Sequence, residues 1–470
     1  MIRRYYAKKD NTISNAFQEN LTTRATGSNM GASDILEVFS IYGQASSGSS
    51  ELERVLIEFD TAQTEADRTA GKIPASGSVS WFLKMSNAPH SQTVPSEFDL
   101  VVSAVSGTWE EGYGIDMDYY EDLTRDVIGS NWIRRTGSTS WSTEGGDYYV
   151  SPTFTQTFNT GLEDMELDVS ELVEQWIKKT SGGGKDNHGF GIKLPDATET
   201  AARSFYTKKF FGRDSEFFFQ RPVLEARWDS ARKDDRGYFY ASSSLVSATD
   251  NLNALYLYNR VRGRLRDYPV MPTSASLRLS STDAVGSNLV ATAVSKVSTG
   301  IYTADIALDT TASVVYDIWY SGSVAYHTGS VSVKSFNSYG YNPEDVYVLS
   351  MPSLRDEYKK DQTHRLNLYV REKNWSPNIY TQAVRTAIPS LIIPSGSFQL
   401  RRAIDDYVVV SYGTGSNMHT GLSYDVSGNY FDLDTTYLEA GYLYDIQYSF
   451  YDEENGWEEQ PYRFKFRVVD

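Results

Sequence analysis

Apolar and polar residues alternate with a period of two through much of the first hundred residues. Four segments carry this pattern: 35–42, 55–59, 79–85 and 98–105. Because successive side chains of an extended chain point to opposite faces, each segment predicts a strand with one buried face. The 34 tyrosines, together with many Val, Thr and Ser residues, also favour strands over helices.

One segment has helical spacing instead. Its apolar side chains share one helical face: Val169, Leu172, Val173, Trp176 and Ile177. Asp168 and Glu171 have the spacing of a capping box, and the glycines at 182–184 are expected to end the helix. We therefore predict one short helix whose Trp176, with Leu172 beside it, is buried on the neighbouring strands.

The second half of the chain contains an internal repeat. A dense polar run at 230–236 precedes it and predicts a domain boundary. The matched segments occur in the same order in both copies: 255–260 with 366–371, 276–279 with 397–400, 300–311 with 428–436, and 316–321 with 444–449. This order indicates two copies of one fold.

The repeats set the expected domain organisation. Residues 237–340 and 341–470 each have the size and the short strands of an immunoglobulin-like sandwich, with the boundary between them near 335–340. The matches place Tyr316 over Tyr444 and Asp317 over Asp445. The predicted fold class is all-β: a jelly-roll-like sandwich at 1–229 with one short helix, followed by two immunoglobulin-like sandwiches.

Composition and charge exclude several classes of protein. The net charge of −17 argues against nucleic-acid binding, which needs a basic face. The chain has no cysteine, so it lacks disulfides, thiol catalysis and cysteine metal sites. It has no apolar run of about 18 residues, so we expect no membrane insertion. The N-terminus has no apolar core, so we expect synthesis in a cytoplasm without a signal peptide.

Several motifs of the first half carry a resemblance. In order they are Leu56-Ile-Glu-Phe-Asp60, Thr108-Trp-Glu-Glu-Gly112, the helix Asp168–Trp176, Asn187-His-Gly-Phe-Gly-Ile192 and Arg221-Pro-Val-Leu-Glu225. This set resembles the DNRLRE-type β-sandwich family, a jelly-roll module related to carbohydrate-binding modules. The resemblance covers residues 1–229 and implies a jelly roll there. The chain departs from the family in Glu58, where an Arg is usual, and in a long insertion at 113–149.

The insertion holds the acidic residues that could do chemistry. Asp116, Asp118, Glu121 and Asp122 could supply oxygen ligands to a structural Ca²⁺, or the acid and base of a glycosidase. We rank a third interpretation, a solvated acidic loop, above the calcium site and the glycosidase site, because the spacing of the acidic residues matches no EF-hand. No other cofactor is expected. The five histidines show no metal-binding spacing, and no nucleophile-elbow or Walker motif is present.

Aromatic residues of the same region are the candidates for binding. Trp109, Tyr113, Trp132 and Trp141 offer rings that stack on sugars or anchor protein contacts. We expect Trp109 to pack in the sandwich. Trp132 and Trp141 lie inside the insertion and are expected to need the core less, which makes them the predicted contact residues.

The combination of modules leads to a functional hypothesis. An adhesion-type sandwich followed by two duplicated immunoglobulin-like modules, without an export signal, resembles virion structural proteins of tailed bacteriophages, especially of large marine myoviruses. The expected role is a non-enzymatic component of the capsid, neck, tail, baseplate or a fibre, located in the virion in several copies and bound to other virion proteins. The alternatives are a protein that binds host surface glycans and, third, a glycoside-active enzyme.

Overall fold

The computed structural model describes residues 1–89, 95–115, 129–269, 275–282, 288–334, 346–373, 375, 390–413, 415, 418–452 and 455–470. The chain divides into two compact units, residues 2–228 and residues 229–470, the latter joined by Met1. The division falls beside residue 229, where the sequence analysis ended its first sandwich. Both units are built almost entirely of antiparallel strands, so the all-β fold class is confirmed.

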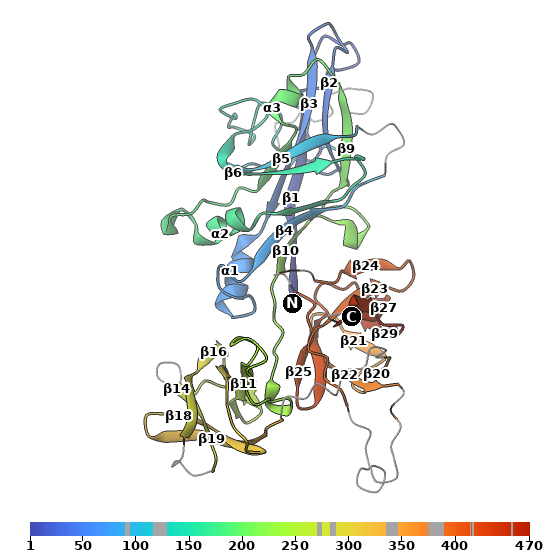
Figure 1. The fold of residues 1–470 in the computed structure, drawn as a ribbon. Coiled ribbons are helices and arrows are strands. Elements are labelled where there is room, and N and C mark those ends of the chain that lie inside the picture. Colours follow the sequence, from blue (N-terminus) through green and yellow to red (C-terminus); the bar gives the residue numbers. More distant parts are fainter. Residues whose placement is uncertain are drawn as a thin grey trace. The chain divides into compact units, whose positions relative to one another are not determined.

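The first unit is organised by strand β1 (Ile2–Ser14), which belongs to two sheets (Figure 1). Its residues 2–6 pair with β10, and after a register shift near Ala7 its remaining residues pair with β3. A strand that passes from one sheet to the other closes the edge between the two layers of a sandwich. The other strands of this unit are β2 (Ile35–Tyr42), β3 (Ser50–Phe59), β4 (Ser80–Met85), β5 (Phe98–Val105), β6 (Tyr148–Phe158), β7 (Met165–Asp168), β8 (Phe190–Lys193), β9 (Phe205–Phe211) and β10 (Val223–Arg227).

Helix α2 (Ser170–Lys178) is the helix that the apolar spacing predicted. The exposed fraction of Trp176 and of Leu172 is 0%, and the Trp176 ring meets Phe190 edge-on at 4.6 Å, so their predicted burial is confirmed. The predicted capping box does not form. Asp168 is the last residue of β7 and pairs with Phe82, so the helix begins two residues later. The Asp168 carboxylate accepts from the Ser170 N–H instead.

The described residues of this unit form two further helices, so the prediction of a single helix is wrong. Helix α1 (Thr61–Thr69) begins after Asp60, whose carboxylate caps the Ala62 N–H, and α3 (Asp196–Glu199) is one short turn. The buried side of α1 is polar, because Asp67 accepts from the Tyr5 hydroxyl and pairs with Arg3. A helix with a polar buried face has no apolar periodicity, which is the signal that the sequence analysis used.

The second unit contains the two repeats. Among the described residues, the first repeat has a four-stranded sheet, a three-stranded sheet and a two-stranded hairpin, and the second has a four-stranded and a six-stranded sheet. The strands of the first repeat are β11 (Asn253–Tyr258), β12 (Arg260–Val261), β13 (Arg264–Leu265), β14 (Ala275–Ser280), β15 (Asn288–Ala293), β16 (Ser295–Ser298), β17 (Ile301–Ile306), β18 (Val314–Ser321) and β19 (Val324–Ser332). Those of the second are β20 (Tyr347–Ser350), β21 (Glu357–Lys359), β22 (Thr363–Glu372), β23 (Gly396–Arg402), β24 (Tyr407–Val410), β25 (Ser423–Asp425), β26 (Gly428–Asp434), β27 (Leu443–Asp452), β28 (Gly456–Glu459) and β29 (Phe464–Val469). The predicted boundary at 335–340 lies outside the described residues.

The two repeats pair their strands in the same way. Strand β14 lies between β15 and β18, as β23 lies between β24 and β27. Strand β17 pairs with β11 and β16, as β26 pairs with β22 and β25. The shared pattern supports the duplication that the sequence repeats indicated.

The residue-level match of the repeats is wrong by one position. Leu277 of β14 lies opposite Trp319, and the equivalent Phe398 of β23 lies opposite Tyr448. This register puts Tyr444 on the core face, where it is fully buried, whereas Tyr316 lies on the outer face of its sheet and is half-buried. A shift of one residue moves a side chain to the other face of a strand, so Tyr316 does not lie over Tyr444.

Candidate functional site

The three tryptophans proposed as site residues form one buried cluster in the first unit. Trp109, Trp132 and Trp141 are 2%, 5% and 6% exposed and pack on Ile13 and Leu56. The expectation that Trp132 and Trp141 need the core less than Trp109 is therefore wrong. The described end of the insertion, from residue 129 onward, folds back onto the sandwich and contributes its own large side chains to the core.

Hydrogen bonds and stacked cations fix this cluster. The Trp109 indole donates to the carbonyl of His188 at 2.8 Å, and the Trp141 indole donates to the carbonyl of Asn131 at 2.9 Å. The Arg54 guanidinium stacks over Trp132 at 5.0 Å and binds both carboxylate oxygens of Glu199 at 3.0 and 2.6 Å. These contacts make the cluster a structural core, with no ring face free for a ligand.

The remaining predicted residues are placed differently. Tyr113 is 74% exposed, and it is the one predicted aromatic residue that the structure places at the surface. Asp116, Asp118 and Asp122, the predicted calcium ligands, lie with Glu121 outside the described residues. Within the described ranges, no group of three or more His, Asp or Glu side chains is arranged to hold a metal ion. No helix in those same ranges is long and apolar enough to span a bilayer.

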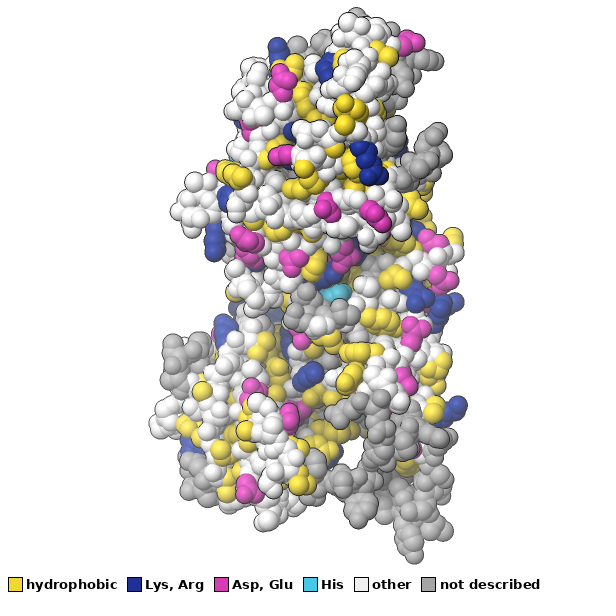
Figure 2. All heavy atoms as spheres, turned by 45° about the horizontal axis from the view of Figure 1, so that its top comes forward, with side chains coloured by type: hydrophobic (Ala, Val, Ile, Leu, Met, Phe, Trp, Pro, Cys, Tyr) yellow, Lys and Arg dark blue, Asp and Glu magenta, His cyan; other side chains and the backbone are white. Residues whose placement is uncertain are grey.

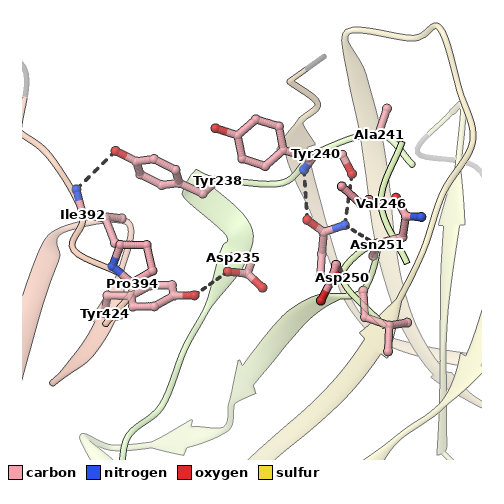
Figure 3. A pocket seen from close by; sticks show the side chains of 12 residues that line it. Asp235, Tyr238, Tyr240, Ala241, Val246, Asp250, Asn251, Ile392, Pro394 and Tyr424 are labelled. Atoms are coloured by element: carbon pink, nitrogen blue, oxygen red, sulfur yellow. Dashed lines mark hydrogen bonds between the residues drawn. The ribbon is translucent and has the colours of Figure 1, made fainter. Parts of the chain in front are cut away.

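The second unit contains a cavity of about 360 Å³ that the sequence analysis did not foresee (Figure 3). One side is the segment that begins in the domain boundary, with Asp235, Tyr238 and Tyr240. The other side comes from the last repeat, with Tyr424 and Ile392. The lining is mixed, because aromatic rings and aliphatic side chains alternate with carboxylates and amides.

The polar groups of this cavity are largely bonded to one another, as the dashed lines of Figure 3 show. The Tyr424 hydroxyl donates to Asp235 at 2.7 Å, and the second carboxylate oxygen of Asp235 accepts from the Ala254 N–H. The Ile392 N–H donates to the Tyr238 hydroxyl at 3.2 Å. Burial raises the pKa of Asp235, and burial followed by the bond to Asp235 raises the pKa of Tyr424. The residues that line the cavity therefore join the two repeats by hydrogen bonds.

The segment 231–241, which we call the clamp, continues this joint on both sides. Its Lys233 forms a parallel bridge to Tyr424 of β25, extending the sheet of the last repeat. Its Arg236 binds both carboxylate oxygens of Asp317, which is 0% exposed and lies in the first repeat. The charges that predicted a boundary at 230–236 also tie it to both repeats, through Asp235 to Tyr424 and through Arg236 to Asp317.

The distribution of charge agrees with the acidic composition. On the face drawn in Figure 2, the described Lys and Arg side chains are interspersed with Asp and Glu and form no continuous basic patch. Many of the basic groups are used in ion pairs, such as Arg4 with Glu225 at 2.6 Å. This face therefore has no electrostatic footprint for nucleic acid.

Comparisons with known proteins give no family. No protein-family model and no curated protein matches the sequence. The resemblance to the DNRLRE-type family therefore stays a prediction.

Solved structures give remote similarities. The adhesin InvE of Yersinia pseudotuberculosis is 13% identical with a TM-score of 0.16, and the match covers 49% of this chain and 57% of that one. The S-layer protein SbsC, domains 4 and 5, is 10% identical with a TM-score of 0.15, covering 45% of this chain and 76% of that one. The Escherichia coli adhesin FdeC is 11% identical with a TM-score of 0.15, covering 60% and 77%. TM-scores this low carry no argument about function.

Proposed function

We propose that the protein is a non-enzymatic attachment or structural protein, and more closely a virion component of a tailed bacteriophage. Its sandwiches dock on neighbouring virion proteins, and several copies are present on each particle. The chain is made in the host cytoplasm and becomes part of the particle there.

The observation that carries this proposal is the clamp between the two repeats. The clamp precedes the first repeat in the chain, yet it adds to a sheet of the last repeat and forms an ion pair of two hydrogen bonds with the first. A tandem of sandwiches coupled in this way suits a protein that holds partners at a set spacing, because displacement of one module is resisted by the other. The sequence resemblance to phage virion proteins supports the narrower assignment.

Quantitative mass spectrometry of purified particles tests the proposal. Particles are freed of host protein on two successive density gradients, and peptides of this chain are counted against those of the major capsid protein. The proposal expects a constant ratio, corresponding to a whole number of copies per particle, that survives high-salt washing because specific interfaces are screened little by salt. A ratio that falls towards zero with each purification step would contradict it.

The second candidate function is glycan binding, which an exposed aromatic pair in the last repeat favours, as argued below. The third, glycoside hydrolysis, depends on Asp118 and Glu121, and no described residue supports it. It predicts turnover of polysaccharide that is lost on Asp118→Asn, which a reducing-sugar assay detects.

A further inference from the structure

The last repeat presents an aromatic pair at its surface. All nine tryptophans lie in the described part of the chain; seven are buried and Trp375 is half-buried, but Trp457 is 46% exposed. Tyr451, also 46% exposed, lies directly opposite it across the β27–β28 hairpin. Their ring centroids are 5.6 Å apart and the planes are inclined by 57°. Two aromatic rings that are exposed side by side, each with an apolar body and a polar tip, suit a binding surface.

Polar side chains continue from this pair along the same face. Glu459 lies two residues from Trp457 and opposite Ser449, so the two side chains share a face. The Gln447 amide donates to Glu459 at 2.5 Å, and the Tyr412 hydroxyl donates to its other oxygen at 3.4 Å. Gln447 is 5% exposed, and its carbonyl oxygen Oε1 has no hydrogen-bond partner in the described part of the chain. The face thus offers two rings followed by the exposed Glu459 carboxylate, whose position is set by Gln447 and Tyr412.

The charges on this face are mixed. Gln399 lies opposite Gln447, and Arg401, two residues further on β23, is therefore on the same side of the sheet as Glu459. The Arg401 guanidinium donates to Gln399 at 2.8 Å. Arg401 also lies opposite Asp445 of β27, so charges of opposite sign are interspersed on this face and no single sign dominates it.

We propose that this face, made by Trp457, Tyr451, Glu459, Gln447 and Tyr412, binds a neutral, hydroxyl-rich glycan. The apolar side of a sugar ring stacks on the aromatic pair, and its hydroxyl groups donate to the Glu459 carboxylate. A protein partner fits less well, because the core of a protein interface is depleted of charge and here Glu459 shares the face of the rings, two residues from Trp457. The Glu459 carboxylate also disfavours an acidic glycan. This site goes beyond the proposed role in a particle and does not depend on it.

The test uses the purified full-length chain on an array that contains neutral hexose oligosaccharides and oligogalacturonates, followed by calorimetric titration of the neutral sugar that binds. We expect binding to a neutral oligosaccharide and no binding to the acidic ones. Trp457→Ala and Glu459→Gln should each lower the affinity at least about 10-fold. The control Tyr113→Ala removes an even more exposed aromatic ring elsewhere and should leave the affinity unchanged.

The results of these measurements either support or overturn the proposed glycan site. Thermal melting of each variant shows whether the chain stays folded, which we expect because both side chains are largely exposed. Trp457→Phe keeps a ring, so it should retain more of the affinity than Trp457→Ala. Binding to no neutral glycan, binding to acidic glycans alone, or unchanged affinity in folded Trp457→Ala would each overturn the proposal. Loss of a virion protein contact in that variant, without glycan binding, would assign the face to a protein partner instead.

Discussion

The Arg236 guanidinium binds the Asp317 carboxylate through two hydrogen bonds of 2.9 and 2.6 Å. The two residues are 81 positions apart, and Asp317 also accepts from the Trp319 indole at 2.9 Å. Through this pair a charged segment at a domain boundary is fastened to the core of the first repeat. The stability of the first repeat is therefore coupled to the position of the clamp.

Arg236→Ala should destabilise the second unit strongly. The substitution leaves the Asp317 carboxylate buried without its cation, which typically costs about 3–5 kcal/mol. Calorimetry of the full chain should show one unfolding transition moved to lower temperature while the transition of residues 2–228 is unchanged. Arg260→Ala, an exposed arginine of the same repeat, is the control and should change little. Equal behaviour of the two variants would mean that the pair contributes no stability.

Trp176→Ala should lower the free energy of unfolding of the first unit by about 3–5 kcal/mol, because it removes the largest buried side chain of α2 and leaves a cavity. Trp176→Phe should cost clearly less. The buried indole nitrogen has no partner in the described part of the chain, so phenylalanine also removes an unsatisfied donor. Chemical denaturation followed by far-ultraviolet circular dichroism measures the stability of both variants. A phenylalanine variant as unstable as the alanine variant would show that the indole N–H is satisfied in solution.

Trp132→Ala should unfold or strongly destabilise the first unit instead of weakening a surface contact. The ring is buried among Trp109, Trp141 and Leu56 and lies under the Arg54 guanidinium, so its removal leaves a cavity worth about 3–5 kcal/mol. Tyr113→Ala, at a 74% exposed position, should shift stability by no more than about 0.5 kcal/mol. Thermal melts of both variants decide the matter, and a Trp132→Ala melt like that of the unmodified chain would place this ring outside the core.

Asp10 should make the first unit less stable as the pH rises. Its side chain is 0% exposed, and burial raises the pKa of its carboxyl from 3.8 to about 7. Between pH 4 and pH 7 the folded chain therefore holds a proton that the unfolded chain has lost, so the free energy of unfolding falls with rising pH, by at most about 1.4 kcal/mol per pH unit.

Asp10→Asn removes this titration. Melting temperatures of the first transition at pH 5, 6 and 7 should fall less steeply in this variant than in the unmodified chain. Asp309→Asn, at an exposed position, is the control and should keep the original slope. Parallel slopes for Asp10→Asn and the unmodified chain would show that Asp10 is ionised throughout.

The parts of the fold that could be predicted from the sequence are those with strong periodicity. The α2 face repeats at helical spacing, so the burial of Trp176 followed from local pattern alone. The strand order of the repeats followed from their matching segments. Their residue register did not, because alternation fixes which residues share a face but not which face is inside, and Tyr316 and Tyr444 differ in that respect.

The candidate site could not be predicted for a different reason. Trp132 and Trp141 lie in a segment without periodicity, so only the folded chain shows that they complete the core. The ion pair of Arg236 with Asp317 joins residues that are distant in sequence. The contact of Gln447 with Glu459 depends on which side chains share a face of the β27–β28 hairpin. Exposure of Trp457 was not visible in the sequence, because buried and exposed tryptophans look alike there.

Cryo-electron microscopy of intact particles tests the central claim most directly. The account predicts density into which residues 237–470 fit as two adjacent sandwiches with matching strand order, at defined positions and in contact with another virion protein. Particles whose reconstructed protein shell and tail are fully assigned to other chains, with no density for these sandwiches, would contradict it.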